Sequence, residues 1–505
     1  MNLRQEAFVS GNVPPPEQTV PGVGSPQDRP DSNSGAIESL RRGLSFRHLQ
    51  LIAIGGTIGT GLFLGSGKAI NLAGPSIIFV YAIIGFMLFF VMRAMGELLL
   101  SNLNYKSFID FTEDLLGPWA GFFTGWTYWF CWIVTVISEI IAISGFVLFW
   151  WHDIPLWVPA AIAIVALLAL NLPTVTAFGE IEFWFALIKI VAILTLIVVG
   201  LVLIFMAFPL PGGGVASFAN IWNDNGMFPN GFVGFVAGFQ VAVFSFVGLE
   251  MVGTAAAETK DPRRNLPRAI NAIPLRLVLF YVLSIAIIIS VTPWSQIVPD
   301  KSPFVAMFIL AGVTTAAGII NFVVLTSASS SANSGIYSTS RMLFGLAKAG
   351  DAYFGFGRLS SRRVPANALV FSSAFLLLAV ALLYAGRSVM EAFTMTTTLA
   401  SLLFIFVWSM ILFAYIAYRK RRPRLHAQSS YKMPGGVAMC FVVLAFFAFV
   451  LWALSQKEDT LFGLFLTPIW FAVLGFAYSL LRKNEWHRVR REEFAKKVRD
   501  ELAAR

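Results

Sequence analysis

Apolar residues in this chain form long continuous blocks and are not spaced along one face of shorter helices. Each block holds about 20 or more residues, which matches the hydrocarbon thickness of a bilayer. The pattern therefore predicts an all-α polytopic membrane protein. Twelve spans are expected, at about 48–70, 74–99, 119–149, 157–177, 181–207, 231–257, 270–292, 303–335, 365–384, 389–418, 436–455 and 461–482.

Composition and charge agree with this pattern. The chain has 505 residues, of which 57% are hydrophobic and 13% are charged, whereas a soluble domain carries about 25% charge. Three loops, 258–276, 336–364 and 418–432, carry most of the Lys and Arg between the spans. The loops on the other side hold Lys68, Lys301, Arg387 and Lys457. The positive-inside rule then places both termini and the basic loops in the cytoplasm. Topology explains the net charge of +10, so no nucleic-acid partner is expected.

The two ends of the chain differ from the apolar part. Residues 1–38 are rich in Pro, Gly and polar residues and are expected to be a disordered cytoplasmic tail. They contain no apolar core of a cleaved signal peptide. The twelve-helix domain is expected at 39–482, followed by a polar cytoplasmic helix in the tail 483–505.

The first span opens with "LIAIGGTIGTGLFLGSG", Leu51–Gly67, which contains six glycines. Nucleotide-binding motifs do not fit, because Leu62 and Leu64 stand where a phosphate loop and a dinucleotide fingerprint require glycine. One interpretation is close packing of membrane helices through small residues four apart. The other is a broken helix whose unpaired backbone lines a binding cavity. Glycines on both faces favour the break.

A second candidate break lies in the sixth span. "FSFVGLE" sits past its centre and contains Ser245, Gly248 and the acid Glu250. Breaks in spans one and six fit two halves of five helices each, followed by two further helices. An inverted repeat of this kind is how many secondary transporters build a site near the membrane midplane.

Ionisable residues inside spans are functional candidates because burying them in lipid is costly. Lys189 and Glu250 each lie eight positions from the cytoplasmic end of a span, or about 12 Å along the helix axis. Lys189 is a candidate proton carrier, with a structural pair or a snorkelling side chain as the alternative. Glu139 faces either the substrate cavity or a polar helix contact. Arg93 and Glu97, one turn apart, are expected to form a local ion pair.

The other polar residues in the spans are weaker evidence for a functional site. The serine-rich stretch of span eight, "LTSASSSANSGIYSTSRML", either lines the pathway or joins helices. Cys131 and Cys440 have no spacing that predicts a disulfide, and the four histidines are too scattered in sequence for a metal site. No nucleophile–base constellation is apparent, so the chain is not expected to be an enzyme. A membrane sensor is not expected either, because the sequence contains no soluble signalling domain.

The combination of "GGTIGTGLFLGSG", "FSFVGLE", "AETKDPRRNLPRAI" and "SSANSGIYSTSRMLFGLA" resembles the amino-acid transporter family of the amino acid–polyamine–organocation superfamily. The resemblance runs from about residue 40 to about residue 480. It implies a leucine-transporter-type fold, with a 5+5 inverted repeat and broken helices one and six. It also implies a bacterial cytoplasmic (inner) membrane protein surrounded by lipids.

The resemblance assigns roles to particular residues. Backbone groups in the first break would hold a substrate carboxylate: Thr57, Ile58, Gly59, Thr60 and Gly61. Carbonyls of Ile54 and of the second break would hold its ammonium group, and the second-break site residues are Phe244, Ser245, Phe246, Val247 and Gly248. Lys189 and Glu250 would couple transport to protons, so that sodium is dispensable. Ser138 and Glu139 would border the substrate side chain.

The resulting expectation is proton-coupled import of small neutral amino acids such as glycine, D-alanine and D-serine. The proton gradient is the driving force and no cofactor or metal is needed. The alternatives are a permease of the same family for proline, aromatic amino acids or 4-aminobutyrate, and an exchanger or polyamine carrier. The sequence does not determine the oligomeric state.

Overall fold

The described residues form helices joined by turns and loops, with one isolated β-bridge between Pro209 and Val215. Helices satisfy every backbone polar group within one segment, which is what lipid requires of a spanning element. The computed structural model describes residues 56–105, 107–172, 175–210, 213–254, 261–310, 314–361 and 364–503. Residues 1–38, with the predicted disordered tail, lie outside them.

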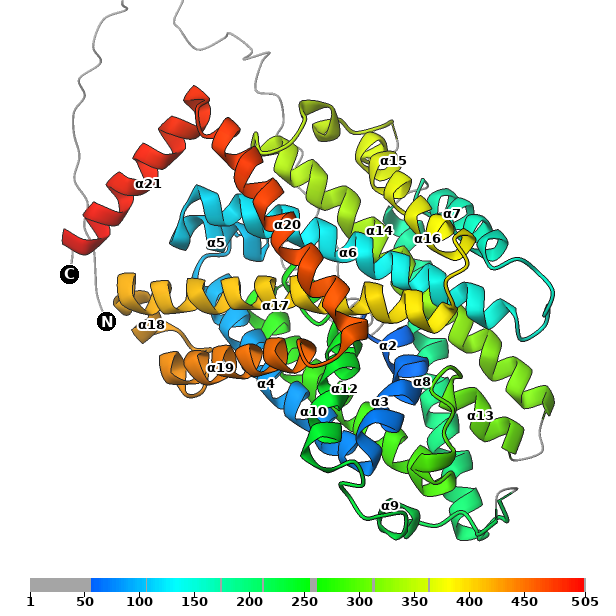
Figure 1. Cartoon of the computed structure of the whole chain (residues 1–505). Coiled ribbons are helices and arrows are strands. Elements are labelled where there is room, and N and C mark those ends of the chain that lie inside the picture. The colour runs from blue at the N-terminus through cyan, green and yellow to red at the C-terminus, as the bar shows by residue number, and fades with distance from the viewer. Residues whose placement is uncertain are drawn as a thin grey trace, which may run out of the picture. The chain divides into compact units, whose positions relative to one another are not determined.

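The helices follow one another in chain order along these residues (Figure 1). Their bounds are α2 Thr60–Phe63, α3 Gly65–Ala73, α4 Ile77–Ser101, α5 Phe108–Leu116, α6 Pro118–Val147, α7 Trp157–Asn171, α8 Val175–Phe205, α9 Asn220–Asn223, α10 Gly231–Ala242, α11 Met251–Thr254, α12 Pro262–Val291, α13 Pro303–Leu310, α14 Thr314–Lys348, α15 Ala366–Phe375, α16 Leu377–Tyr384, α17 Val389–Arg421, α18 Pro423–Gln428, α19 Gly436–Leu454, α20 Glu458–Leu481 and α21 Glu485–Ala503. Short 3₁₀ turns are η1 Gly74–Ser76, η2 Val243–Phe246, η4 Trp294–Gln296 and η5 Phe354–Gly357.

Within the described residues, nine segments are long and apolar enough to cross a membrane. They are Gly65–Ser101, Pro118–Val147, Glu182–Phe205, Gly231–Thr254, Pro262–Val291, Ala366–Tyr384, Val389–Arg421, Gly436–Leu454 and Glu458–Leu481. Three of the twelve predicted spans are not among these nine segments as segments of their own. The first begins outside the described residues, α7 has only 15 residues, and α14 is long but rich in serine. The polytopic membrane class is confirmed, and the number twelve stays a prediction.

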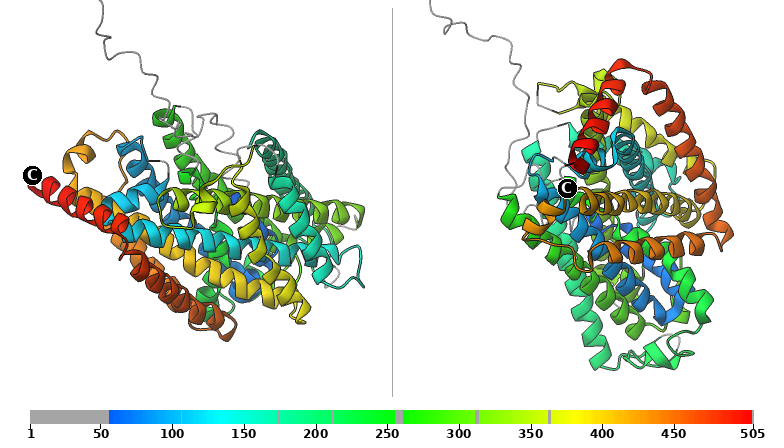
Figure 2. Two further views of the ribbon diagram at one scale, coloured as in Figure 1. Left: turned by 90° about the horizontal axis from the view of Figure 1, so that it is seen from above. Right: turned by 90° about the vertical axis from the view of Figure 1, so that its left-hand side faces the viewer.

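The core of the bundle is built around α6, which lies between α14 and α17 (Figure 1). Most of α6 is buried, including the large side chains of Tyr128 and Trp132. By contrast, α20 runs along the outside of the helical core (Figure 2) and exposes Phe465, Ile469 and Val473. These residues recur every four positions, so one stripe of α20 faces outward, as expected for a helix in contact with lipid tails.

Both predicted breaks are interruptions of a helix. In the first span, the chain bends at Ile58 and Gly59 before the short helix α2, which is followed by α3. In the sixth span, α10 ends at Ala242 and passes through η2 into a turn before α11. Gly248 in this turn has φ +100°, a backbone conformation that favours glycine.

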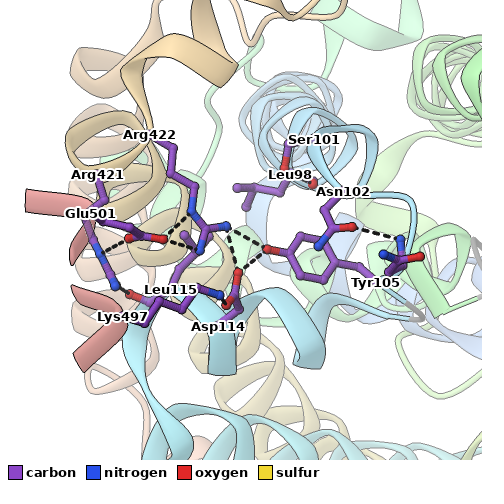
Figure 3. A network of polar contacts seen from close by, with 11 residues as sticks. Leu98, Ser101, Asn102, Tyr105, Asp114, Leu115, Arg421, Arg422, Lys497 and Glu501 are labelled. Atoms are coloured by element: carbon purple, nitrogen blue, oxygen red, sulfur yellow. Dashed lines mark hydrogen bonds and ion pairs between the residues drawn. The ribbon is translucent and has the colours of Figure 1, made fainter. Parts of the chain in front are cut away.

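The segment after α20 forms α21, which packs against the polar ends of other helices (Figures 2 and 3). Figure 3 shows Glu501 of α21 accepting from Arg421 at 3.1 Å and from Arg422 at 2.8 Å. Arg422 also pairs with Asp114 of α5 at 2.7 Å, and Asp114 contacts Lys497 of α21. Loops that the positive-inside rule assigned to one side thus lie together in space.

Two acids in contact with α21 have pKa values that are shifted in opposite directions. Burial acts to raise the pKa of Asp114, but hydrogen bonds from Arg422, Lys497 and Tyr105 outweigh it and lower the pKa to about 2. Burial raises the pKa of Asp351 to about 6, although the charge and hydrogen bond of Arg490 act in the opposite direction. Asp351 therefore depends on Arg490, 3.1 Å away, to carry its charge in this buried position.

The prediction of a local ion pair between Arg93 and Glu97 is wrong, because each residue contacts other partners. Glu97 is fully buried and accepts from Tyr415 at 2.9 Å and from the backbone N–H of Met433 at 2.7 Å, with His426 beside it. Arg93 stacks over a different residue, Tyr431. The loop after α18 folds back onto α4, and sequence spacing within α4 does not reveal that.

Replacing Arg490 by alanine should loosen the packing of α21. The change leaves Asp351, which is 4% exposed, without its cation, and a hydrogen bond to a charged group contributes about 1.5–3 kcal/mol. We expect the backbone amides of α21 to exchange with deuterium at least about tenfold faster, because each 1.4 kcal/mol is a factor of about ten. Mass spectrometry of peptides from 485–503 measures this.

Arg488→Ala on the same helix is the matched control. Its side chain is 60% exposed and pairs with Glu485 at 3.4 Å, and exposed pairs of this kind contribute little. Exchange in α21 should stay at the rate of the unmodified chain. Equal exchange rates in the two variants would contradict a special role for Arg490.

Candidate functional site

The two helix breaks meet face to face in the interior of the bundle. A side chain on Gly61 would place its Cβ 2.7 Å from Cα of Ser245, and one on Gly248 would lie 2.9 Å from the carbonyl oxygen of Gly56. Glycine is therefore required at both positions for the backbones to approach this closely. The glycines of the first break serve helix interruption and close packing together.

Side chains from neighbouring helices bind the carbonyl groups that the breaks release. The Tyr281 hydroxyl of α12 donates to Ser245 O at 2.8 Å and lies 3.2 Å from Thr57 O, so it bridges the two breaks. Ser327 of α14 donates to Ile58 O at 3.0 Å, and Ser331 to Gly56 O at 3.4 Å. The serine-rich face of α14 thus holds the first break in place.

Tyr81 of α4 adds a side-chain contact to the second break. Its hydroxyl lies 3.0 Å from Ser245 Oγ, and both side chains are buried. The rings of Tyr81, Phe246 and Tyr281 pack on one another, with centroid separations between 5.2 and 5.8 Å. Aromatic rings and hydroxyls from α4 and α12 therefore position the second break.

Glu139 of α6 points at the first break. Its Oε2 accepts from the backbone N–H of Thr60 at 3.4 Å, and Oε1 lies 2.5 Å from where a Cβ on Gly59 would be. A small cavity lies at this place, lined by Gly56, Thr57, Gly59, Gly61, Thr135, Glu139, Phe244, Val247 and Ser331. Glu139 therefore both lines this cavity and makes a polar contact with the first break, and the two sequence interpretations both stay predictions.

Lys189 is fully buried on α8 and interacts electrostatically with two acids, Glu182 of its own helix and Glu139 of α6. Glu182 is 1% exposed and accepts a hydrogen bond from Ser330 of α14 at 2.8 Å. Two buried carboxylates, one of which contacts the first break, therefore act electrostatically on one buried lysine. This arrangement fits the alternative of a structural pair as well as that of a proton carrier, and only an experiment separates the two.

Glu250 has a different environment. Its carboxylate accepts from the backbone N–H of Gly248 at 3.2 Å and lies 3.4 Å from both the Tyr128 hydroxyl and the indole N–H of Trp408. The acid therefore binds back onto its own turn and onto α6 and α17. Lys189 and Glu250 lie at the same depth along their spans. The contacts of the described residues nevertheless give them different partners.

The remaining predicted residues fall into three groups. Thr57, Gly59, Gly61, Phe244 and Val247 line the cavity, and Ile58, Thr60, Ser245, Phe246 and Gly248 form the breaks beside it. Ser138 is buried and donates to the carbonyl of Val134 on its own helix, and it is not among the lining residues. Ile54 lies outside the described residues.

Sequence reasoning missed Glu182, Tyr81 and Tyr281. Glu182 had a usable signal, because it lies seven positions before Lys189 and so on the same face of α8. The two tyrosines had none, since their spans are apolar throughout and only the packing of α4 and α12 brings their hydroxyls to the second break.

Comparison with known proteins agrees with this geometry. The family model described as amino acid permease matches residues 48–490. A D-serine/D-alanine/glycine transporter of Escherichia coli is 62% identical over 454 residues, which cover 90% of this chain and 97% of that protein. An amino-acid permease of Bacillus subtilis is 48% identical, covering 91% of this chain and 98% of the relative.

A more distant relative is an aromatic amino acid transport protein of Escherichia coli, which is 39% identical over 88% of this chain and 97% of its own length. The family match spans far more than half of the chain, and these relatives are transporters and not enzymes. The interrupted helices, the cavity between them and the full-length similarity lead to one conclusion: the chain belongs to the amino acid permease family.

Proposed function

We propose that this permease imports small neutral amino acids, among them D-serine, D-alanine and glycine, by symport with protons. The observation that carries the substrate class is the cavity between the two helix breaks, where backbone groups and the Glu139 carboxylate converge. The particular substrates rest on the Escherichia coli relative that is described as a transporter of these three and is 62% identical over 90% of the chain.

An interrupted helix suits recognition of the groups that all amino acids share. We assign the substrate carboxylate to backbone N–H groups of Thr57–Gly61, where the chain bends before α2, because interrupted helices in secondary transporters direct such groups at anionic ligands. The ammonium group would bind carbonyl oxygens of the second break and of Ile54. Glu139 presents an additional acceptor at the same cavity.

The lining side chains favour a small substrate. Thr135 and Phe244 border the cavity together with Val247, and Phe244 packs against Phe393 of α17 at a ring separation of 6.0 Å. The cavity has a free volume of only about 10 Å³ in this structure, so even glycine requires these groups to move apart, and a larger side chain requires a larger movement. Recognition through shared backbone contacts would also admit D-isomers, because the carboxylate and ammonium sites do not by themselves fix the position of the side chain.

Coupling to protons is assigned to Lys189, with Glu250 as a second ionisable residue at the other break. A buried lysine loses its proton easily because burial disfavours the charged form. The proposed driving force is the proton gradient, with neither sodium nor a cofactor required. Transport would proceed by alternating access in a 5+5 inverted repeat of twelve helices, surrounded by lipid in the bacterial inner membrane, with both termini in the cytoplasm.

The function is tested by uptake of labelled glycine, D-alanine, D-serine and L-alanine into proteoliposomes that contain the purified protein. Uptake of glycine and the D-isomers should be concentrative when the outside is acidic, should collapse with a protonophore, and should not change when sodium is omitted. Gradient-driven uptake of proline, an aromatic amino acid or 4-aminobutyrate in place of all four would assign a different substrate to the same family.

Gly61→Ala should reduce this uptake at least about tenfold while the protein still reaches the membrane. The new Cβ would meet backbone atoms of Ser245 at 2.7 and 3.0 Å, and backbone cannot rotate away as a side chain can. The control is Gly475→Ala in α20, where nothing lies within 4 Å. Normal uptake by Gly61→Ala would show that the two breaks need not approach this closely.

Lys189→Met should abolish gradient-driven accumulation. The methionine keeps an unbranched chain of similar length but cannot carry a proton, and it leaves Glu139 and Glu182 without their shared cation. Accumulation at an outside pH of about 5.5 and an inside pH of about 7.5 measures the effect. Lys457→Met, at an exposed position before α20, is the control. Accumulation by Lys189→Met with an unchanged pH profile would remove Lys189 from coupling.

A further inference from the structure

Three buried ionisable residues form a cluster that extends from the first break into α8. Glu139 is 2% exposed, Lys189 is 0% exposed and Glu182 is 1% exposed. Glu139 contacts the backbone of Thr60, and the charges of both acids act on Lys189. Glu182 lies seven positions before Lys189 on α8, about 10 Å along the axis, and thus nearer to the end of the helix that the proposed topology places in the cytoplasm.

Glu182 is set in a polar pocket formed by α14. Ser330 Oγ donates to its Oε1 at 2.8 Å, and Ser334 and Asn333 also face the carboxylate. Asn333 is in turn fixed by Asn171 of α7, whose Nδ2 donates to Asn333 Oδ1 at 2.8 Å. Hydroxyls and amides from two helices therefore gather around one acid, in a region that would otherwise be filled by apolar side chains.

The pocket has unused hydrogen-bonding capacity. Glu182 Oε2, Asn333 Nδ2 and Ser334 Oγ are buried and lack a protein hydrogen bond of good geometry. Buried polar atoms of this kind are normally paired with ordered water. A carboxylate oxygen with a free acceptor position can receive a proton, whereas Oε1 is held by the Ser330 hydroxyl.

The charges of the cluster also matter. One lysine and two carboxylates carry a net charge of −1 when all three are ionised, and one additional proton makes the cluster neutral. Since an uncompensated charge is costly in a membrane interior, the cluster is suited to bind a single extra proton. That proton belongs to the group as a whole, because closely interacting sites titrate together.

We propose that Glu182 is the residue through which Lys189 releases its proton toward the cytoplasm. An N–H bond of the Lys189 ammonium group breaks and, by relay through a water molecule in the polar pocket, an O–H bond forms on the Glu182 carboxylate, which leaves a neutral amine and a carboxylic acid. With the additional proton of the cluster held by Glu139, the acid then loses its proton to cytoplasmic water and the cluster changes from neutral to a net charge of −1. The lysine is reprotonated in the next cycle. This inference rests on the proposed function, in which Lys189 couples transport to protons.

A purely structural role for Glu182, that of joining α8 to α14 through Ser330, makes a different prediction. A structural anchor would be needed for every transport mode. A proton acceptor is needed only for net proton movement. Exchange of labelled for unlabelled substrate at equal pH requires binding and reorientation of the loaded carrier but no release of the proton, so the two roles can be separated by comparing exchange with accumulation.

The experiment uses the full chain in proteoliposomes with labelled glycine as the probe. Glu182→Gln keeps the shape of the side chain and can still accept from Ser330, but its amide cannot carry a proton. Exchange at equal pH should stay within about twofold of the unmodified protein. Accumulation driven by a pH gradient should fall at least about tenfold, and the dependence of uptake rate on inside pH should flatten.

Three further variants sharpen the test. Glu182→Asp keeps a carboxylate and should recover part of the gradient-driven accumulation. Ser330→Ala removes the hydrogen bond of the anchor and keeps the acid, so it should retain coupling. Glu493→Gln, at an exposed position of α21, is the matched control for loss of one acid and should behave as the unmodified protein does.

The outcomes are distinct. Gradient-driven accumulation by Glu182→Gln with an unchanged pH profile would overturn the proposal. Loss of exchange together with accumulation would also overturn it unless Glu182→Asp restores accumulation, which would support it. If the unmodified protein itself shows no dependence on the proton gradient, the proposed function fails first, and that result is visible without any variant.

Discussion

Backbone polar groups that leave a helix inside a membrane have to find other partners, and this constraint organises the centre of the permease. The breaks in the first and sixth spans release carbonyls at Gly56, Ile58 and Ser245. Hydroxyl groups from α12 and α14 bind these carbonyls, and close approach at Gly61 brings the two breaks together. Residues of both breaks also line the cavity, so the constraint that holds the fold together also shapes the lining of the cavity.

The ionisable residues follow from the same low-dielectric interior. Glu139, Lys189 and Glu182 are each almost fully buried, which is tolerable because their charges are close enough to compensate one another. Glu250 is stabilised in another way, by the amide of Gly248 and the polar hydrogens of Tyr128 and Trp408. Glu139 lines the cavity and its charge acts on Lys189 of α8.

At the polar ends of the helices, electrostatic contacts bring distant segments of the chain together. Asp114, Arg422 and Glu501 link α5, the end of α17 and α21, and Glu97 binds the loop that follows α18. The contacts of Asp114, Arg422 and Glu501 are partly exposed, whereas Glu97 is fully buried. Ion pairs near water are weak unless they are partly buried and multidentate. Asp351 and Arg490 satisfy that condition, because their side chains are only 3% and 13% exposed.

The sequence by itself determined the membrane class and the location of both breaks. Long apolar blocks predict spanning helices because the thickness of the lipid fixes their length. Clustered glycines and "FSFVGLE" predict interruptions, because unpaired backbone is tolerated in a membrane only where it lines a cavity or is buried in protein. Only the tertiary structure decided which residues contact one another. Glu139 faces the cavity, Glu97 binds Met433 and not Arg93, and Tyr281 bridges the breaks. Such contacts join residues up to more than 300 positions apart, and periodicity along one helix carries no information about which helix lies opposite.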